Sequence, residues 1–153
     1  MFKKVLLSVI SMIILLSVLA SCSAKTAITE TEFSDLTAKA GYVMTNEAVR
    51  FSTNVTSSLQ ATSSDRRVVI DFYVFSSNDT ARASFNSAVK SLDLISGNKS
   101  GSNYSAANYS LYSYTIDGIY YHYFRIDNTL VCVETDSKNK SAANEMLTTL
   151  GYK

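Results

Sequence analysis

Residues 109–135 read YSLYSYTIDGIYYHYFRIDNTLVCVET, and this stretch decides the fold. Asp117-Gly118 lies between two alternating runs, a pattern typical of a two-residue type I′ hairpin. Asp127-Asn128 favours a second tight turn further along the chain. We therefore expect three antiparallel strands joined as a meander, at about 108–116, 119–126 and 129–135.

The two turns also predict which side chains share a face of this sheet, because successive strand residues point to opposite sides. One face receives a set of opposed tyrosines with an arginine at its edge: Tyr112, Tyr114, Tyr121, Tyr123 and Arg125. The other face includes Phe124 and Val131 and has the apolar character that a helix layer covers. We expect the helices on that second face.

The tyrosine face, completed by Tyr73 from a strand at 67–75, is the candidate binding surface. Tyrosine buries its ring while its hydroxyl stays in water, which suits a half-exposed sheet or a recognition surface. Two interpretations remain open at this point. The tyrosines are cross-strand pairs that only stabilise the sheet, or they form a surface that contacts a ligand or partner.

The rest of the chain predicts three helices and more strands. Apolar residues at helical spacing predict helices at about 30–40, 79–95 and 138–150. The segment 43–66 contains one or two weak strands, with turns at Ser57-Ser58 and 63–65. Residues 97–108, with two glycines and little apolar content, are expected to form an exposed, mobile loop.

The fold class that follows is α+β, with the order α-β(β)β-α-βββ-α. We expect an antiparallel, or mixed, sheet of about 4–5 strands, with three helices packed mainly on one face.

Composition excludes several function classes. The formal net charge is +1, which argues against nucleic-acid binding because that needs a basic surface. One histidine and two cysteines exclude multi-histidine and cysteine-based metal sites. No cofactor and no metal is expected.

No catalytic residues are predicted. The lone histidine, His122, is expected in a core or strand position, because the sequence fixes no second catalytic group beside it. Cys132 lies in an apolar run and is expected to be an inert thiol. Asp71 is explained by a salt bridge or an edge position. The acidic residues Asp127, Glu134 and Asp136 lack the spacing of a calcium loop.

The N-terminus carries a targeting signal. Lys3 and Lys4 precede an apolar run at 5–18, which is short for a membrane-spanning helix. Leu19-Ala20-Ser21-Cys22 then resembles the lipobox of bacterial lipoproteins: an apolar residue, two small residues and a cysteine. An ordinary secretory signal with a chance cysteine, or an uncleaved anchor, is the alternative.

The resemblance to bacterial lipoproteins implies a signal peptide at 1–21, a lipid on the sulfur of Cys22, a tether at 22–28 and one domain at 29–153. It implies an extracytoplasmic protein anchored to the cell membrane. The body resembles small uncharacterised envelope lipoproteins. The expected role is a non-enzymatic module that binds a protein, peptide or small ligand through the tyrosine face. The alternative is an accessory subunit of an envelope complex, or a homo-oligomer, that uses the same face.

Overall fold

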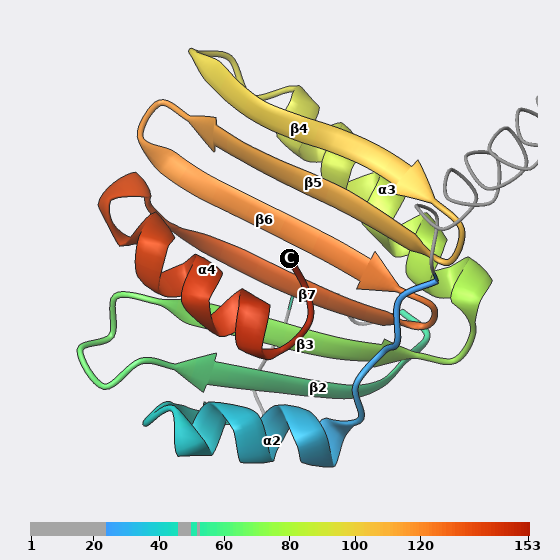
Figure 1. Cartoon of the computed structure of the whole chain (residues 1–153). Helices are drawn as coiled ribbons and strands as arrows, with labels where there is room; N and C mark the ends of the chain where they lie inside the picture. The colour runs from blue at the N-terminus through green and yellow to red at the C-terminus, as the bar shows by residue number, and fades with distance from the viewer. Residues whose placement is uncertain (1–23, 46–49, 52) are drawn as a thin grey trace, which may run out of the picture.

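A computed structural model describes residues 24–45, 50–51 and 53–153. Their main feature is a seven-stranded antiparallel sheet with the strand order β1-β2-β3-β7-β6-β5-β4 (Figure 1). The strands are β1 (Val43–Thr45), β2 (Val55–Thr62), β3 (Val69–Phe75), β4 (Lys99–Ala106), β5 (Tyr109–Ile116), β6 (Ile119–Ile126) and β7 (Thr129–Asp136).

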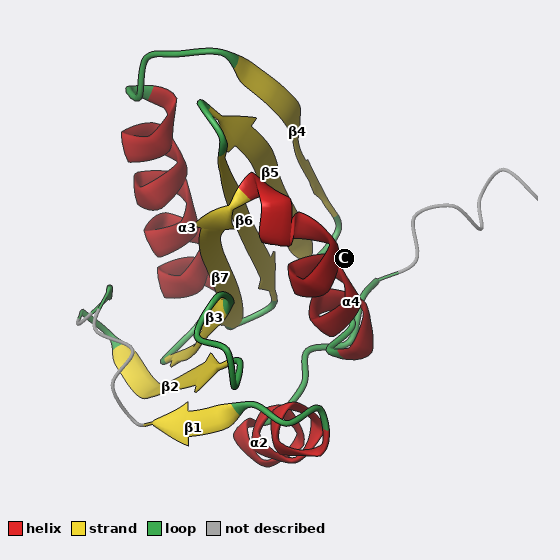
Figure 2. Cartoon of the chain, turned by 90° about the vertical axis from the view of Figure 1, so that its left-hand side faces the viewer, coloured by secondary structure: helices red, strands yellow, loops and turns green. Residues whose placement is uncertain are grey.

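Helices cover both faces of this sheet. Figure 2 shows α3 (Asn78–Asp93) on one side, with α2 (Glu30–Lys39) and α4 (Lys140–Thr149) on the other. A 3-10 turn at Ser137–Asn139 leads into α4. The elements follow the order α-β-β-β-α-β-β-β-β-α. We call the two sides of the sheet the α3 face and the α2/α4 face.

The fold class expected from the sequence is therefore wrong in three respects. The sheet has seven strands rather than 4–5, the element order differs, and the helices do not gather on one face. The helix α3 covers the tyrosine side, because Ala81, Phe85, Val89 and Leu92 turn an apolar stripe toward it.

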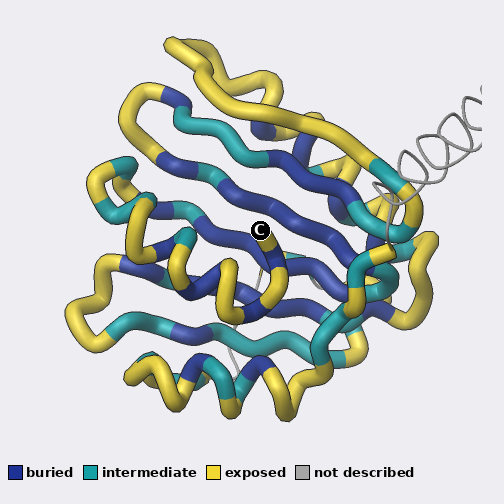
Figure 3. The backbone as a smooth tube through the Cα atoms, in the orientation of Figure 1, coloured by how far each residue is buried: buried dark blue, intermediate teal, exposed yellow. Residues whose placement is uncertain are grey.

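The extra strand β4 replaces the expected mobile loop at 97–108. It lies at the edge of the sheet, and seven of its eight residues are exposed (Figure 3). An edge strand is held by backbone pairing with one neighbour and needs few apolar side chains. The expected turn at Ser57-Ser58 is also wrong, because β2 runs through it.

The meander is confirmed residue by residue. Tyr112 pairs with Tyr123, and Tyr114 pairs with Tyr121. Asp117 and Gly118 both have positive φ, at 46° and 87°, as a type I′ turn requires.

Capping boxes begin α2 and α3, close to the positions predicted from the sequence. The Thr29 hydroxyl accepts from the backbone N–H of Glu32, and the Glu32 carboxylate accepts from the backbone N–H of Thr29. Ser77 and Thr80 form the equivalent capping box at the start of α3. Beyond the first cap, Phe33 stacks on Phe72 at a centroid distance of 4.7 Å, which fixes α2 on the sheet.

Candidate functional site

The tyrosine face lies in the core beneath α3. Tyr73, Tyr112 and Tyr123 are almost completely buried among apolar residues of that helix, and Arg125 is 2% exposed. Tyr114 and Tyr121 are half-buried. The expectation of a half-exposed tyrosine face is thus wrong for Tyr73, Tyr112 and Tyr123. Only Tyr114 and Tyr121, which lie nearest the Asp117-Gly118 turn, stay partly exposed.

A polar cluster lies beside this buried face. One Nη of Arg50 lies 2.6 Å from the Glu134 carboxylate and 2.6 Å from the Tyr123 hydroxyl. The Tyr123 hydroxyl donates to the same carboxylate. Arg50 also donates its backbone N–H to the Tyr73 hydroxyl at 3.1 Å. We call Arg50, Tyr73, Tyr123 and Glu134 the Arg50 cluster.

Asp71 extends the cluster inward along β3. Its carboxylate accepts from the Gln60 side chain at 2.9 Å and lies 3.8 Å from Arg50 Nε. Burial raises the pKa of Asp71, and the hydrogen bond from Gln60 and the charge of Arg50 partly oppose that rise. The expected salt bridge of Asp71 is present.

Burial weakens the acid–base chemistry available in this region. It raises the pKa values of the Tyr73 and Tyr123 hydroxyls and of the Cys132 thiol. Each of these groups therefore stays protonated near neutral pH. A buried, protonated thiol is a poor nucleophile, so Cys132 behaves as the inert core residue that the sequence predicted.

Two adjoining hollows, of about 410 and 340 Å³, lie along α3 next to the Arg50 cluster. Both are lined by Arg50, Phe51 and Ser87, so we treat them as one surface and call it the α3 groove. Further lining residues include hydroxyl-bearing side chains of α3 (Thr80, Ser84 and Ser91) together with Tyr123 and Glu134. The groove therefore offers hydroxyls, the aromatic rings of Phe51 and Tyr123, and charges of both signs.

His122 lies elsewhere, on the α2/α4 face, and is 2% exposed. Its neighbours are the hydroxyls of Tyr120 and Ser113 and the carbonyl oxygen of Tyr152. Burial lowers the pKa of His122 to about 4. The expected core position is confirmed.

No metal site is present in the described ranges 24–45, 50–51 and 53–153, where no group of three or more His, Cys, Asp or Glu side chains is placed to hold an ion. Within the same ranges, no helix is long and apolar enough to cross a membrane.

The chain enters the domain at a clamp formed by Asn108. The Asn108 side chain accepts from the backbone N–H of Lys25 at 3.0 Å and donates to the Lys25 carbonyl at 2.8 Å. It also donates to the Asp127 carboxylate at 2.8 Å. The first described residues are therefore fastened to the β4–β5 and β6–β7 turns. Cys22 and the lipobox lie outside the described residues.

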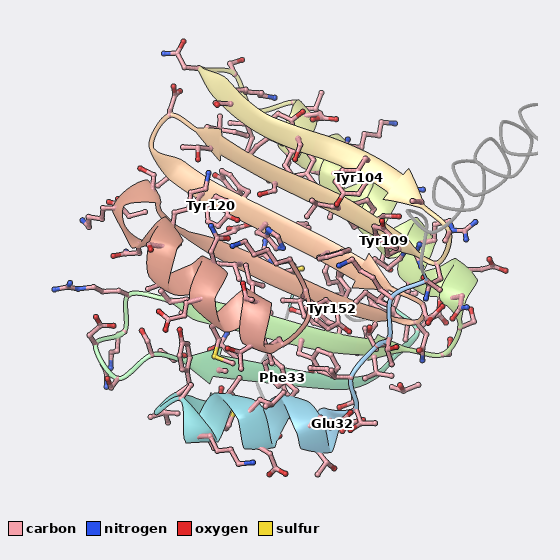
Figure 4. All side chains as sticks on the ribbon, viewed as in Figure 1. Glu32, Phe33, Tyr104, Tyr109, Tyr120 and Tyr152 are labelled. Carbon is pink, nitrogen blue, oxygen red and sulfur yellow. The ribbon has the colours of Figure 1, made fainter. Side chains whose placement is uncertain are left out.

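Lys25 and two tyrosines occupy the part of the α2/α4 face that the helices leave open. The Lys25 ammonium lies 5.5 Å from the centre of the Tyr109 ring. Figure 4 shows Tyr109 beside Tyr104, and their centroids are 6.0 Å apart. Tyr104 is 45% exposed.

Two side chains at these places were not among the residues that the sequence singled out: Arg50 and Asn108. Their roles depend on contacts between distant segments, and no local pattern marks them.

The fold defines a class: a single seven-stranded antiparallel sheet covered by helices on both faces. No protein-family model matches the chain, and no curated protein sequence matches it. A solved structure with a similar fold is a GTP-binding regulator from Thermotoga maritima, with a TM-score of 0.50 and 12% identity over 81% of this chain and 85% of that one. A weaker likeness, with a TM-score of 0.42 and 9% identity, covers 81% of this chain and 90% of the extracellular domain of PknH from Mycobacterium tuberculosis. At such identities the likeness concerns the fold alone.

Proposed function

We propose that this chain is a lipoprotein precursor whose mature form is anchored outside the cell membrane through a lipid on Cys22, and whose domain is a non-enzymatic binding module. The observation that carries the proposal is the distance between the lipobox and the fold. Lys25, held by Asn108, follows Cys22 by three residues, which span at most about 10 Å. The sheet end with the β4–β5 turn would therefore stand directly over the lipid surface.

The binding surface in this proposal is the α3 groove rather than the tyrosine face. The groove combines exposed hydroxyls with Phe51 and the Arg50–Glu134 pair, so it can orient a polar ligand or a peptide segment. The non-enzymatic part is supported by His122, which is buried away from the groove, and by Cys132, whose thiol stays protonated.

The anchoring is tested by Cys22→Ala in cells that express the full chain. We expect the wild-type protein in the membrane fraction with the mass of a lipid on its first residue, and the variant without that mass. Cys132→Ala is the matched control, because it removes the other cysteine and leaves the lipobox intact. Identical masses and fractionation for the wild type and the Cys22 variant contradict the proposal.

The binding role is tested with a photo-crosslinking amino acid at Ser87, in the α3 groove, and at Lys39, on α2. Both positions are exposed, so neither change disturbs the core. We expect a discrete crosslinked product from position 87 and none from position 39. Absence of a product from position 87 contradicts the groove as the binding surface.

A second candidate role is assembly through the β4 edge. Strand β4 pairs only with β5, and its other edge is unpaired within the described part of the sheet. Such an edge is a template for strand addition by a second chain. Light scattering on the full chain in detergent tests this role. A dimer that Ser102→Lys converts to a monomer favours assembly, and a monomer at all concentrations contradicts it.

A further inference from the structure

Another hollow, separate from the α3 groove, lies between α3 and the β4–β5 hairpin. It has a volume of about 280 Å³. Its lining includes Arg82 and Asn86 of α3, Ser105 of β4, Tyr109 and Ser110 of β5 and Arg125 of β6. We call it the Arg125 pocket. Nothing in the proposed function uses these residues.

Arg125 is the unusual residue of this pocket, because it is a charged side chain that is only 2% exposed. One Nη donates to the Asp127 carbonyl oxygen at 2.9 Å, and the other donates to the Ser110 hydroxyl at 3.3 Å. Its Nε has no hydrogen-bond partner among the described residues, although it is buried. A buried donor without an acceptor is costly, so Nε needs an explanation such as a bound ion or water.

The neighbouring side chains add further donors. The Ser110 oxygen accepts from both Arg125 and the Ser105 hydroxyl, at 3.3 and 3.0 Å. A hydroxyl that accepts twice still has its own proton to donate. Arg82 contributes a second guanidinium, and the ion pairs of the described residues include neither Arg82 nor Arg125.

The charged side chains that line the pocket are both positive. Burial, and after it the positive charge of Arg82, lower the pKa of Arg125, while the Asp127 carboxylate partly opposes them. That carboxylate is not among the lining residues and accepts a hydrogen bond from Asn108. Two arginines therefore line one small space whose lining holds no carboxylate. An anion entering the pocket would relieve their repulsion and accept hydrogen bonds from the two arginines.

From this geometry we propose that the Arg125 pocket binds a phosphate group, held by Arg82, Arg125 and the Ser110 hydroxyl. Phosphate has several acceptor oxygens, which match the forked donors of two arginines. The volume lies just below the usual range of small-ligand pockets, about 300–1,000 Å³, and suits a single charged group.

Two sources of the phosphate group are compatible with the position of the pocket. Arg125 and Asn108 both contact Asp127, and Asn108 clamps Lys25, so the pocket is at the sheet end where the chain enters. If the anchoring proposed above is correct, this end faces the lipid headgroups. The other source is free phosphate or a soluble phosphomonoester, and this alternative does not depend on anchoring.

The test uses the full chain purified in a non-ionic detergent and titrated calorimetrically at constant ionic strength. One arm uses inorganic phosphate, a second uses dihexanoyl phosphatidic acid below its micellar concentration, and a third uses acetate. Because Arg125 is buried and its replacement could prevent folding, the variant is Arg82→Gln, at an exposed position. Arg66→Gln is the matched control, since Arg66 is exposed in a turn away from the pocket.

We expect saturable binding of at least one phosphate compound that Arg82→Gln weakens on the order of tenfold and Arg66→Gln leaves unchanged. Tighter binding of the lipid than of inorganic phosphate identifies the headgroup as the source, and equal binding identifies the free anion. Equal affinity for acetate, equal effects of the two variants, or no saturable binding in any arm overturns the proposal. None of these results depends on lipidation, so they are distinct from a failure of the Cys22 test.

Discussion

The imidazole Nε2 of His122 lies 2.8 Å from the carbonyl oxygen of Tyr152, and this contact ties the C-terminal segment to the centre of the sheet. A carbonyl oxygen only accepts, so Nε2 carries the proton. In the neutral ring Nδ1 is then an acceptor, and it faces the Tyr120 hydroxyl at 3.0 Å. Figure 4 shows both tyrosines on the α4 side of the sheet, Tyr120 near the start of that helix and Tyr152 near its end. The histidine is held in one tautomer inside the core.

Acidification should therefore destabilise the fold through His122. Burial lowers its pKa to about 4 in the folded state, below the ordinary value of 6.5; the hydrogen bond to Tyr152 partly opposes this shift, and Lys140 and Lys153 add to it. Between these values the unfolded chain binds the proton and the folded chain does not, so stability falls as the pH falls. The expected loss is about 2 kcal/mol between pH 7 and pH 5. Urea unfolding of the wild type and of His122→Gln measures it. If the free energy of unfolding changes with pH by the same slope in the wild type and in His122→Gln, the effect does not come from His122.

The hydroxyl groups of the buried tyrosines Tyr112 and Tyr123 should contribute differently to the stability of the fold. The Tyr123 hydroxyl is bonded to Arg50 and Glu134, so Tyr123→Phe leaves two charged groups with one partner fewer. The expected cost is about 1–3 kcal/mol. The Tyr112 hydroxyl is buried with no hydrogen-bond partner among the described residues, so Tyr112→Phe should leave the free energy of unfolding unchanged or raise it. Urea unfolding of both variants tests this, and equal losses would contradict it.

The register of the meander was predictable because short-range chemistry determines it. Asp117-Gly118 admits the positive φ values of a type I′ turn, and once that turn is set, Tyr112 must oppose Tyr123. The capping box of Thr29 and Glu32 is equally local. These features involve residues close together in the chain, so the sequence pattern alone determines them.

Which face of the sheet each helix covers was not predictable in the same way. Alternation separates the side chains of β5 and β6 into two sets, but it does not say which set a helix will cover. The tyrosine side looked polar enough for solvent, yet Phe85 and Val89 of α3 pack against it. Tyrosine tolerates either environment, because its ring can be buried whether or not its hydroxyl reaches water.

The Arg50 cluster and β4 were missed for different physical reasons. The Arg50–Glu134 contact joins residues 84 positions apart, and no sequence period links them. Strand β4 is serine-rich, and its composition is that of a loop, because an edge strand exposed on both sides is held by its backbone.

Gly101 should be required for β4 to pair with β5. A Cβ at this position would overlap the Ser113 carbonyl oxygen and lie 2.8 Å from Cγ of Tyr114, whose side chain lies against the glycine. Tyrosine covering a glycine in the neighbouring strand is a known stabilising arrangement. Gly101→Ala should therefore destabilise the edge by about 1–3 kcal/mol. Hydrogen exchange of the β4 amides measures this.

The control for Gly101 is Ser100→Ala, at the adjacent exposed position of the same strand. It should leave the exchange rates of β4 nearly unchanged. Comparable protection of β4 in the Gly101 and Ser100 variants would show that the close approach of Ser113 and Tyr114 does not limit the pairing.

Asn108 should control whether the start of the domain stays attached to the sheet. Its side chain makes both hydrogen bonds to the backbone of Lys25, and no apolar side chain substitutes for them. Asn108→Ala should therefore release residues 24–28, with faster hydrogen exchange and faster proteolysis there, while the centre of the sheet stays protected. Asn103→Ala, at an exposed position of β4, is the matched control. Unchanged exchange at residues 24–28 in the Asn108 variant would mean that the other contacts of the segment hold it: those of Lys25 with Tyr109, Phe124 and Lys153, and the packing of Ala27 and Ile28 on the core.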